Sequence, residues 1–262
     1  MEMAKSDIEL SKQVKKHKLI DLTFNFEEAN HYLQSVVQTK KLYQLLLLIL
    51  ISFILIYTPL WNFLYTNLFG ETSKYVKAML QSCFYTIPIA IPFFWIFRFD
   101  IQKIFKKFTL HQYKKTWWIA LYIIFIIMFV ALTVSTITSF EFATNQGFVG
   151  ERKLILFRIF VLFIQLFGEN LIFISLLLGC YKLLQYVTSH ERTIIIISFL
   201  LASIIFGIFH LPTYNFNLIQ CIFFIGIPAL PHLIVFVKYQ NAHMGYWVHL
   251  NYDLMLLVLV LL

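Results

Sequence analysis

The side chains of this chain that could do chemistry are the ionisable ones inside its long apolar segments. Only two of the 13 Asp and Glu residues lie there, Glu169 and Asp253. Three of the eight histidines, His210, His232 and His249, also lie in apolar segments. An ionisable group costs roughly 2.5–3.5 kcal/mol at the centre of a bilayer, so it usually marks a function.

Glu169, His210, His249 and Asp253 come from three separate apolar segments, and together they suit hydrolysis. His249 and Asp253 are four residues apart, which places them on one face of a helix. A glutamate with two histidines can activate a water, polarise a carbonyl and stabilise an oxyanion. The same four residues are candidate ligands of a divalent metal such as zinc, although the chain contains no H-E-x-x-H signature.

Each candidate also has a purely structural interpretation. A single histidine in a membrane commonly makes an interhelical hydrogen bond, and we apply this interpretation to His232 and His243, which lack an acidic companion. Asp253 can serve as the hydrogen-bond partner of His249. Glu169 has the strongest case for a function, because packing gives no reason for a carboxylate at mid-membrane. Its alternative is a protonated acid bonded to a backbone carbonyl.

The composition of the 262 residues indicates an all-α polytopic membrane protein. Hydrophobic residues make up 60% of the chain and charged residues 13%, and the mean hydropathy is +0.77. So few charges cannot cover a water-facing surface, which excludes soluble globular and disordered classes. The three cysteines are odd in number and lie in apolar runs, so a disulfide framework is not expected.

Seven segments have the roughly 20 mostly apolar residues that a membrane-spanning helix requires. We expect them to form a helix bundle, with kinks or shortened helices where the second and sixth segments contain prolines. The predicted spans are Leu42–Trp61, Val76–Phe97, Thr116–Ser139, Leu154–Tyr181, Thr193–Leu211, Leu218–Tyr239 and Met244–Leu262.

The distribution of Lys and Arg predicts the orientation. With seven spans, 16 of the 21 basic residues fall on one side of the membrane, and the more basic side is normally the cytoplasmic one. We therefore expect a cytoplasmic N-terminus, with residues 1–41 as a solvated polar and basic tail. These basic residues act as orientation determinants beside membrane lipids, so no nucleic-acid partner is expected.

Straight spans would separate the candidate residues in depth. Glu169 would lie at mid-bilayer, His210 near the outer face and His249 near the cytoplasmic face. Tilted or broken helices are therefore required for a single site.

Two of the segments carry motifs that resemble the CPBP family of intramembrane proteases, also called CAAX proteases, bacteriocin-processing enzymes or the Abi family. That family shows E-E-x-x-x-R, F-x-x-x-H and H-x-x-x-N, in this order, on three helices. The run from Phe206 to His210 matches the second motif. The run from His249 to Asp253 matches the third, with Asp in place of Asn.

The first motif of the family is present in part. Glu169 aligns with its first glutamate, while Asn170 and Ile174 stand in place of its second glutamate and its arginine. The resemblance covers a helical core of catalytic type in residues 154–262. Three further spans precede it in residues 42–153.

The resemblance implies an endopeptidase of a bacterial plasma membrane that hydrolyses a peptide bond of a membrane-associated peptide or protein. Glu169 would be the general base, and His210 would help it to activate water. His249 and Asp253 would support the oxyanion or a metal. An ionised Asp253 would repel an oxyanion, whereas a neutral one could donate a hydrogen bond to it.

Two other classes of function are open. A catalytically impaired relative could act as a membrane regulator or a bacteriocin self-immunity protein through contacts with another membrane protein. The altered first and third motifs favour this alternative. A transporter or channel could use the ionisable residues as a relay, but the sequence has no internal repeat of the kind many transporters show.

Overall fold

The computed structural model describes residues 23–70, 72–138, 140–143 and 155–261, and every regular element in these ranges is helical. The expected all-α fold is therefore confirmed. In chain order the helices are α2 (Phe26–Val37), α3 (Leu42–Tyr57), α4 (Leu60–Leu68), α5 (Lys74–Ile96), α6 (Ile101–Ile104), α7 (Leu110–Thr138), α8 (Ile155–Leu184), α9 (Glu191–Phe209), the 3-10 helix η2 (Leu211–Tyr214), the π-helix η3 (Gln220–Gly226), α10 (Ile227–Tyr239) and α11 (Ala242–Leu261).

Five of the described helical segments are long and apolar enough to cross a membrane, or six if α2 and α3 count as one bent span. The first predicted span was expected to reach Trp61, but α3 ends at Tyr57 and α4 begins after Pro59. The last predicted span forms α11, which is not among these five or six. A polytopic membrane bundle is thus confirmed, with fewer qualifying spans than the seven predicted.

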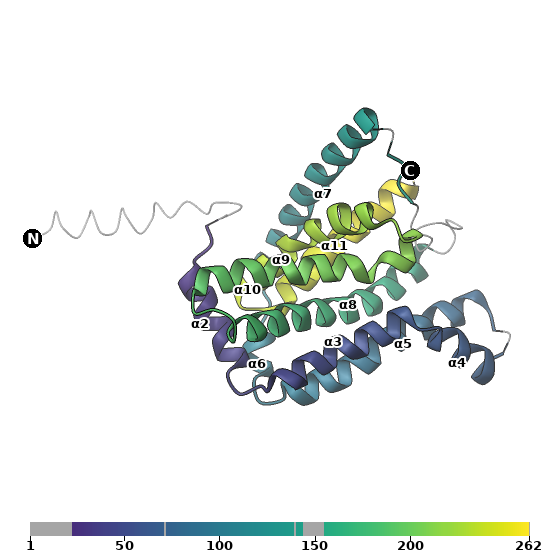
Figure 1. The fold of residues 1–262 in the computed structure, drawn as a ribbon. Helices are drawn as coiled ribbons and strands as arrows, with labels where there is room; N and C mark the ends of the chain where they lie inside the picture. The colour runs from purple at the N-terminus through teal and green to yellow at the C-terminus, as the bar shows by residue number, and fades with distance from the viewer. Residues whose placement is uncertain (1–22, 71, 139, 144–154, 262) are drawn as a thin grey trace, which may run out of the picture.

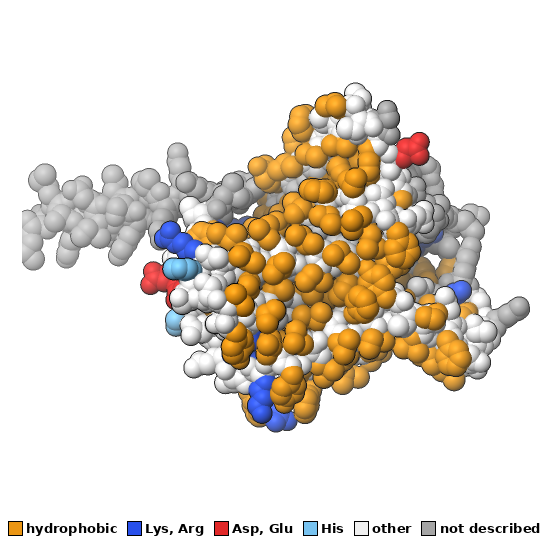
Figure 2. All heavy atoms as spheres, in the orientation of Figure 1, with side chains coloured by type: hydrophobic (Ala, Val, Ile, Leu, Met, Phe, Trp, Pro, Cys, Tyr) orange, Lys and Arg blue, Asp and Glu red, His pale blue; other side chains and the backbone are white. Residues whose placement is uncertain are grey.

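Helix α8 is the centre of the bundle and contacts α3, α5, α9 and α11 (Figure 1). Its side chains Leu171, Ile174 and Leu177 are fully buried. On the face that Figure 2 shows, hydrophobic side chains cover the helices and charged ones lie at the margins. Such an outer surface suits contact with lipid, because it has too few charges for water.

Helix α2 departs from the expected solvated tail. The side chain of Asn25 caps it by accepting hydrogen bonds from the backbone N–H groups of Glu27 and Glu28. Its other face buries Leu33 and Val36 in the core of the bundle, and the helix is bent by 89° from α3. Residues 1–22, the rest of the predicted tail, lie outside the described residues.

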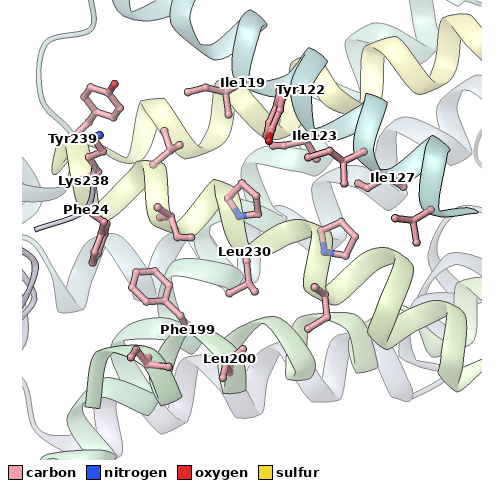
Figure 3. Close-up of a pocket in the computed structure, with 18 of the residues that line it drawn as sticks. Phe24, Ile119, Tyr122, Ile123, Ile127, Phe199, Leu200, Leu230, Lys238 and Tyr239 are labelled. Carbon is pink, nitrogen blue, oxygen red and sulfur yellow. The ribbon is translucent and has the colours of Figure 1, made fainter. Parts of the chain in front are cut away.

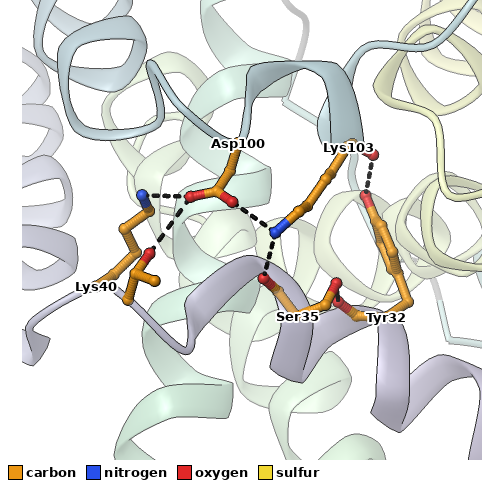
Figure 4. A network of polar contacts seen from close by, with 6 residues as sticks. Tyr32, Ser35, Lys40, Asp100 and Lys103 are labelled. Atoms are coloured by element: carbon orange, nitrogen blue, oxygen red, sulfur yellow. Dashed lines mark hydrogen bonds and ion pairs between the residues drawn. The ribbon is translucent and has the colours of Figure 1, made fainter.

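A buried carboxylate fastens the α2–α3 link to the segment between α5 and α6 (Figure 4). Asp100 Oδ2 lies 2.6 Å from Lys40 Nζ, and Asp100 Oδ1 lies 2.6 Å from Lys103 Nζ. Lys103 Nζ also donates to the carbonyl of Ser35 at 3.1 Å, and Tyr32 Oη donates to the carbonyl of Lys103 at 3.2 Å. We call Lys40, Asp100 and Lys103 the basic clasp.

Glycine lets the helices that carry the candidate site approach closely. A Cβ atom on Gly207 of α9 would lie 2.3 Å from the carbonyl oxygen of Cys221 and 3.1 Å from the Cα atom of Gly226, both in η3. No larger residue fits at this crossing unless the backbone moves. The crossing lies one turn before His210, so it fixes the position of that end of α9.

Candidate functional site

Helices α8 and α9 bring Glu169 and His210 together. Glu169 lies in the middle of α8, and His210 caps the C-terminal end of α9. Glu169 Oε2 is 3.8 Å from His210 Nε2, and each side chain is 20% exposed. The pair is therefore mostly buried among apolar helices, but part of each side chain remains accessible from outside.

Local chain geometry ends α9 at His210. The backbone N–H of His210 donates to the carbonyl of Gly207 at 2.9 Å, and the 3-10 turn η2, with Pro212 in its first turn, follows directly. Proline cannot continue an α-helix in which its N–H would be needed. Asn215 and Phe216 then adopt positive φ angles of 51° and 60°, which redirect the chain towards η3.

Hydrogen bonds determine which atoms of the pair face each other. His210 Nδ1 lies 2.9 Å from the carbonyl oxygen of Phe206. Because a carbonyl only accepts, Nδ1 carries the hydrogen, and Nε2 is the atom directed at Glu169. On the other side, Gln165 Nε2 donates to Glu169 Oε1 at 2.8 Å. Oε1 thus has a partner, and Oε2 is the oxygen that faces the imidazole.

The second pair, His249 and Asp253, lies on one face of α11. His249 Nε2 is 3.9 Å from Asp253 Oδ2, and the side chains are 8% and 15% exposed. The ring of Phe206 contacts both histidines, with centroid distances of 4.8 Å to His210 and 6.0 Å to His249.

The two pairs are close enough to interact electrostatically, Glu169 with His249 and Asp253 with His210. The structure therefore unites all four predicted residues in one region. The separation in depth that straight spans implied is wrong. Helix α9 has 19 residues and α8 has 30. His210 consequently ends α9 near the level of Glu169, not at the far end of α8.

His232 of α10 belongs to this region, although the sequence favoured an ordinary interhelical hydrogen bond for it. Its ring stacks on that of His249 with a centroid distance of 4.8 Å and an interplanar angle of 27°. It is only 3% exposed, and neither ring nitrogen has a hydrogen-bond partner within the described part of the chain. The α10 backbone at His232 approaches α11 closely at Gly245, where an ideal Cβ would lie 2.9 Å from the His232 carbonyl oxygen, and the sequence alone gives no signal of this contact.

The two altered positions of the first motif are both buried. Asn170 is 3% exposed, and its side-chain nitrogen has no hydrogen-bond partner among the described residues. Ile174 is fully buried in the main hydrophobic core. An arginine at that position would place its charge in an apolar environment, so this chain packs a hydrocarbon there instead.

The four candidate residues do not fit the metal site that the sequence left open. Within the ranges that the structure describes, no three or more His, Cys, Asp or Glu side chains form a group that could hold a metal ion. The carboxylates and imidazoles are arranged as two pairs, with nitrogen–oxygen distances of 3.8 and 3.9 Å. We derive no chemistry from a metal here.

What the arrangement can do is orient a water molecule. Two polar atoms 3.8 Å apart leave room for a water oxygen about 2.8 Å from each, which is a normal hydrogen-bond distance. When His210 is neutral, its Nε2 accepts a hydrogen bond as Glu169 Oε2 does, so the two atoms would polarise the two O–H bonds of that water. His249 and Asp253 of α11 interact electrostatically with this pair.

Comparison of the chain with protein-family models, curated proteins and solved structures gives no match. The geometry of the two pairs is therefore the basis on which a function is assigned.

Proposed function

We propose that this protein is an intramembrane peptide hydrolase of the CPBP type, with Glu169 and His210 as the residues that activate water. One observation carries the proposal. Glu169 Oε2 lies 3.8 Å from His210 Nε2, and both side chains are partly accessible in an otherwise apolar bundle. The substrate would be a membrane-associated peptide or protein.

In the proposed reaction, Glu169 accepts a proton from the water as its oxygen attacks the carbonyl carbon of the peptide bond. His210 Nε2 accepts the second hydrogen bond of the water and holds its lone pair towards the carbon. The π electrons of the carbonyl move to its oxygen. When the carbon–nitrogen bond breaks, Glu169 returns the proton to the leaving amine, and the enzyme regains its initial state.

His249 is proposed to stabilise the oxyanion of the intermediate. The N–H of its imidazole ring is a donor of the type that serves this role, and a preformed donor is worth about 2.7–4 kcal/mol in such sites. Asp253, one turn further along α11, is proposed to orient the ring. His232 stacks on the His249 ring and so helps to hold its orientation.

We infer that the N-terminus and the basic clasp face the cytoplasm of a bacterial cell. The support is the excess of Lys and Arg on this side, with 16 of 21 residues in the predicted topology.

The decisive experiment uses a deletion strain of the native host that expresses wild type, Glu169→Gln, His210→Ala or the control Glu141→Gln. Glu141 is an exposed carboxylate outside the helices, so the control removes one charge without touching the site. Immunoblots must show equal insertion. Quantitative mass spectrometry of membrane and secreted peptides should then reveal a product that wild type and Glu141→Gln make and the two site variants do not. A product made by all four strains refutes the proposal.

A second candidate is a catalytically impaired relative that regulates another membrane protein. The observation in its favour is that Ile174 and Asn170 are buried where the family motif has charged residues. This candidate predicts that Glu169→Gln and His210→Ala match wild type in peptides and phenotype. It also predicts that a membrane protein co-purifies with all of them.

A further inference from the structure

A large apolar groove separates α7 from α9, η3 and α10 (Figure 3). Its volume is about 710 Å³, which is within the range of sites that hold a sizeable apolar ligand. Isoleucine, leucine and phenylalanine side chains make up most of its wall, among them Ile123, Ile127, Phe199 and Leu230. The groove is open because α7 leans away from the neighbouring helices towards its C-terminal end (Figure 1).

Two lysines give one end of the groove a positive charge. Lys115 near the start of α7 and Lys238 near the end of α10 both line it. Lys115 Nζ lies 5.7 Å from the centroid of the Tyr239 ring, and Lys238 Nζ donates to the carbonyl of Thr23 at 2.7 Å. No Asp or Glu is among the described residues that line the groove. An occupant with an anionic head and a long apolar tail complements this lining.

The length of the groove matches that kind of molecule. From Lys115 to Val130, both of which line it, helix α7 advances about 22 Å. One leaflet of a bilayer has a hydrocarbon thickness of about 15 Å. An acyl chain can therefore extend from the charged end along α7 without leaving the groove.

We propose that this groove binds an anionic phospholipid, with an acyl chain between α7 and α10 and the phosphate beside Lys115 and Lys238. Basic pockets between membrane helices are suited to lipid headgroups of this charge. The site is separate from the proposed hydrolytic one. Leu230 and Ile234 of α10 line the groove, whereas His232 between them stacks on His249 of α11.

The charge of the site is tested by native mass spectrometry of the purified full chain, titrated with phosphatidylglycerol or phosphatidylcholine of identical acyl chains. Wild type should bind phosphatidylglycerol more tightly. Lys115→Gln and Lys238→Gln should each weaken that binding about fivefold, since a lysine near an anionic headgroup is worth about that factor. The control Lys114→Gln changes an exposed neighbour outside the groove and should alter binding less than twofold. Equal affinity for the two lipids, or an equal effect of Lys114→Gln, overturns the proposal.

The apolar part is tested by filling the groove. Ile126 lines it and is 41% exposed, whereas Leu121 on the same helix is 47% exposed and does not line it. Ile126→Trp should weaken binding of both lipids at least tenfold, and Leu121→Trp should leave it within twofold of wild type. Unchanged binding by Ile126→Trp refutes the site. A wild-type dimer that Ile126→Trp converts to monomers also refutes it, because a second copy of the chain would then cover the groove.

Discussion

Replacing Asp100 by asparagine should destabilise this protein more than any other single change in the basic clasp. Asp100 is 6% exposed and Lys40 is 7% exposed, and their charged atoms are 2.6 Å apart. Asparagine keeps the shape of the side chain and removes its charge. The ammonium of Lys40 then stays buried without a counter-ion, next to the ammonium of Lys103.

The size of the effect follows from burial. Breaking a buried ion pair by removing one partner costs about 3–5 kcal/mol, because the remaining charge is uncompensated. For a chain of this size the loss lowers Tm by about 6–20 °C. Lys40→Met should lower the free energy of unfolding by less than Asp100→Asn does, because Asp100 keeps its contact with Lys103 at 2.6 Å. Lys103→Met should cost only about 0–1 kcal/mol, because the Lys103 side chain is 48% exposed.

The clasp also makes stability depend on pH. Burial raises the pKa of the Asp100 carboxyl, but hydrogen bonds and charges from Lys103 and Lys40 outweigh burial, so the pKa lies below its ordinary value. A carboxyl with a lowered pKa stabilises the folded state above its unfolded-state pKa of about 4. This stabilisation is lost as the pH falls through the folded-state pKa. The difference in Tm between wild type and Asp100→Asn should therefore close in acid.

The assay is thermal unfolding of the purified variants in one detergent, from pH 7 down to pH 3. The expected order of destabilisation is Asp100→Asn, then Lys40→Met, then Lys103→Met. The double variant Asp100→Leu with Lys40→Met should recover part of the loss, because it leaves no buried charge in the clasp. The reasoning is refuted if Lys103→Met costs as much as Asp100→Asn, or if the Tm difference persists unchanged below pH 4.

Three further predictions concern the site and its supports. Glu169→Gln should abolish the peptide product and leave Tm within a few degrees of wild type, because glutamine keeps the contact with Gln165; peptide mass spectrometry and thermal unfolding check both parts. Gly207→Ala should destabilise the fold by about 1–3 kcal/mol, because its Cβ would lie 2.3 Å from the Cys221 carbonyl. His232→Phe should leave Tm unchanged or raised, because it keeps an aromatic ring on His249 and removes two buried ring nitrogens without partners among the described residues.

Controls separate these effects from general damage. Gly179→Ala also adds a methyl group inside a helix, but the group would meet the flexible end of Ile49 at 2.8 Å, so Tm should change little. If Gly179→Ala lowers Tm as much as Gly207→Ala does, the close approach of α9 and η3 at Gly207 does not explain the loss of stability. A fall in Tm of several degrees for His232→Phe would show that the imidazole makes an important polar contact.

The spans of α5, α8 and α9 could be predicted to within a few residues, because hydropathy reports directly on burial in lipid. The first span could not, since a count of apolar residues ignores the break that Pro59 introduces before α4. Helix α2 was missed for another reason. Leu33 and Val36 lie on one face of a helix that is polar on its other face, so an average over the segment hides its packing.

The residues of the site could be predicted from their chemistry, but their convergence could not. Glu169 and His210 are noticed because ionisable groups are rare in apolar segments. Their relative depth follows from the unequal lengths of α8 and α9. The predicted spans had nearly these lengths, but the assumption that each straight span crosses the whole bilayer placed His210 near the outer face. His232 could not be placed, because one sequence does not reveal which neighbouring helix contacts Gly245.

Asp100 and Glu169, two carboxylates of this bundle, differ in a way that bears on their roles. Both carboxylate oxygens of Asp100 lie 2.6 Å from ammonium nitrogens, so the clasp is saturated and offers no position to another molecule. Among the described residues, Glu169 Oε1 has a direct hydrogen bond, with Gln165, whereas Oε2 is 3.8 Å from His210 Nε2. A carboxylate that served stability alone would gain by closing that distance, because burial of an imperfectly paired charge is costly. An open, partly accessible pair is instead what a water-activating site requires, and this contrast favours hydrolysis over a structural ion pair.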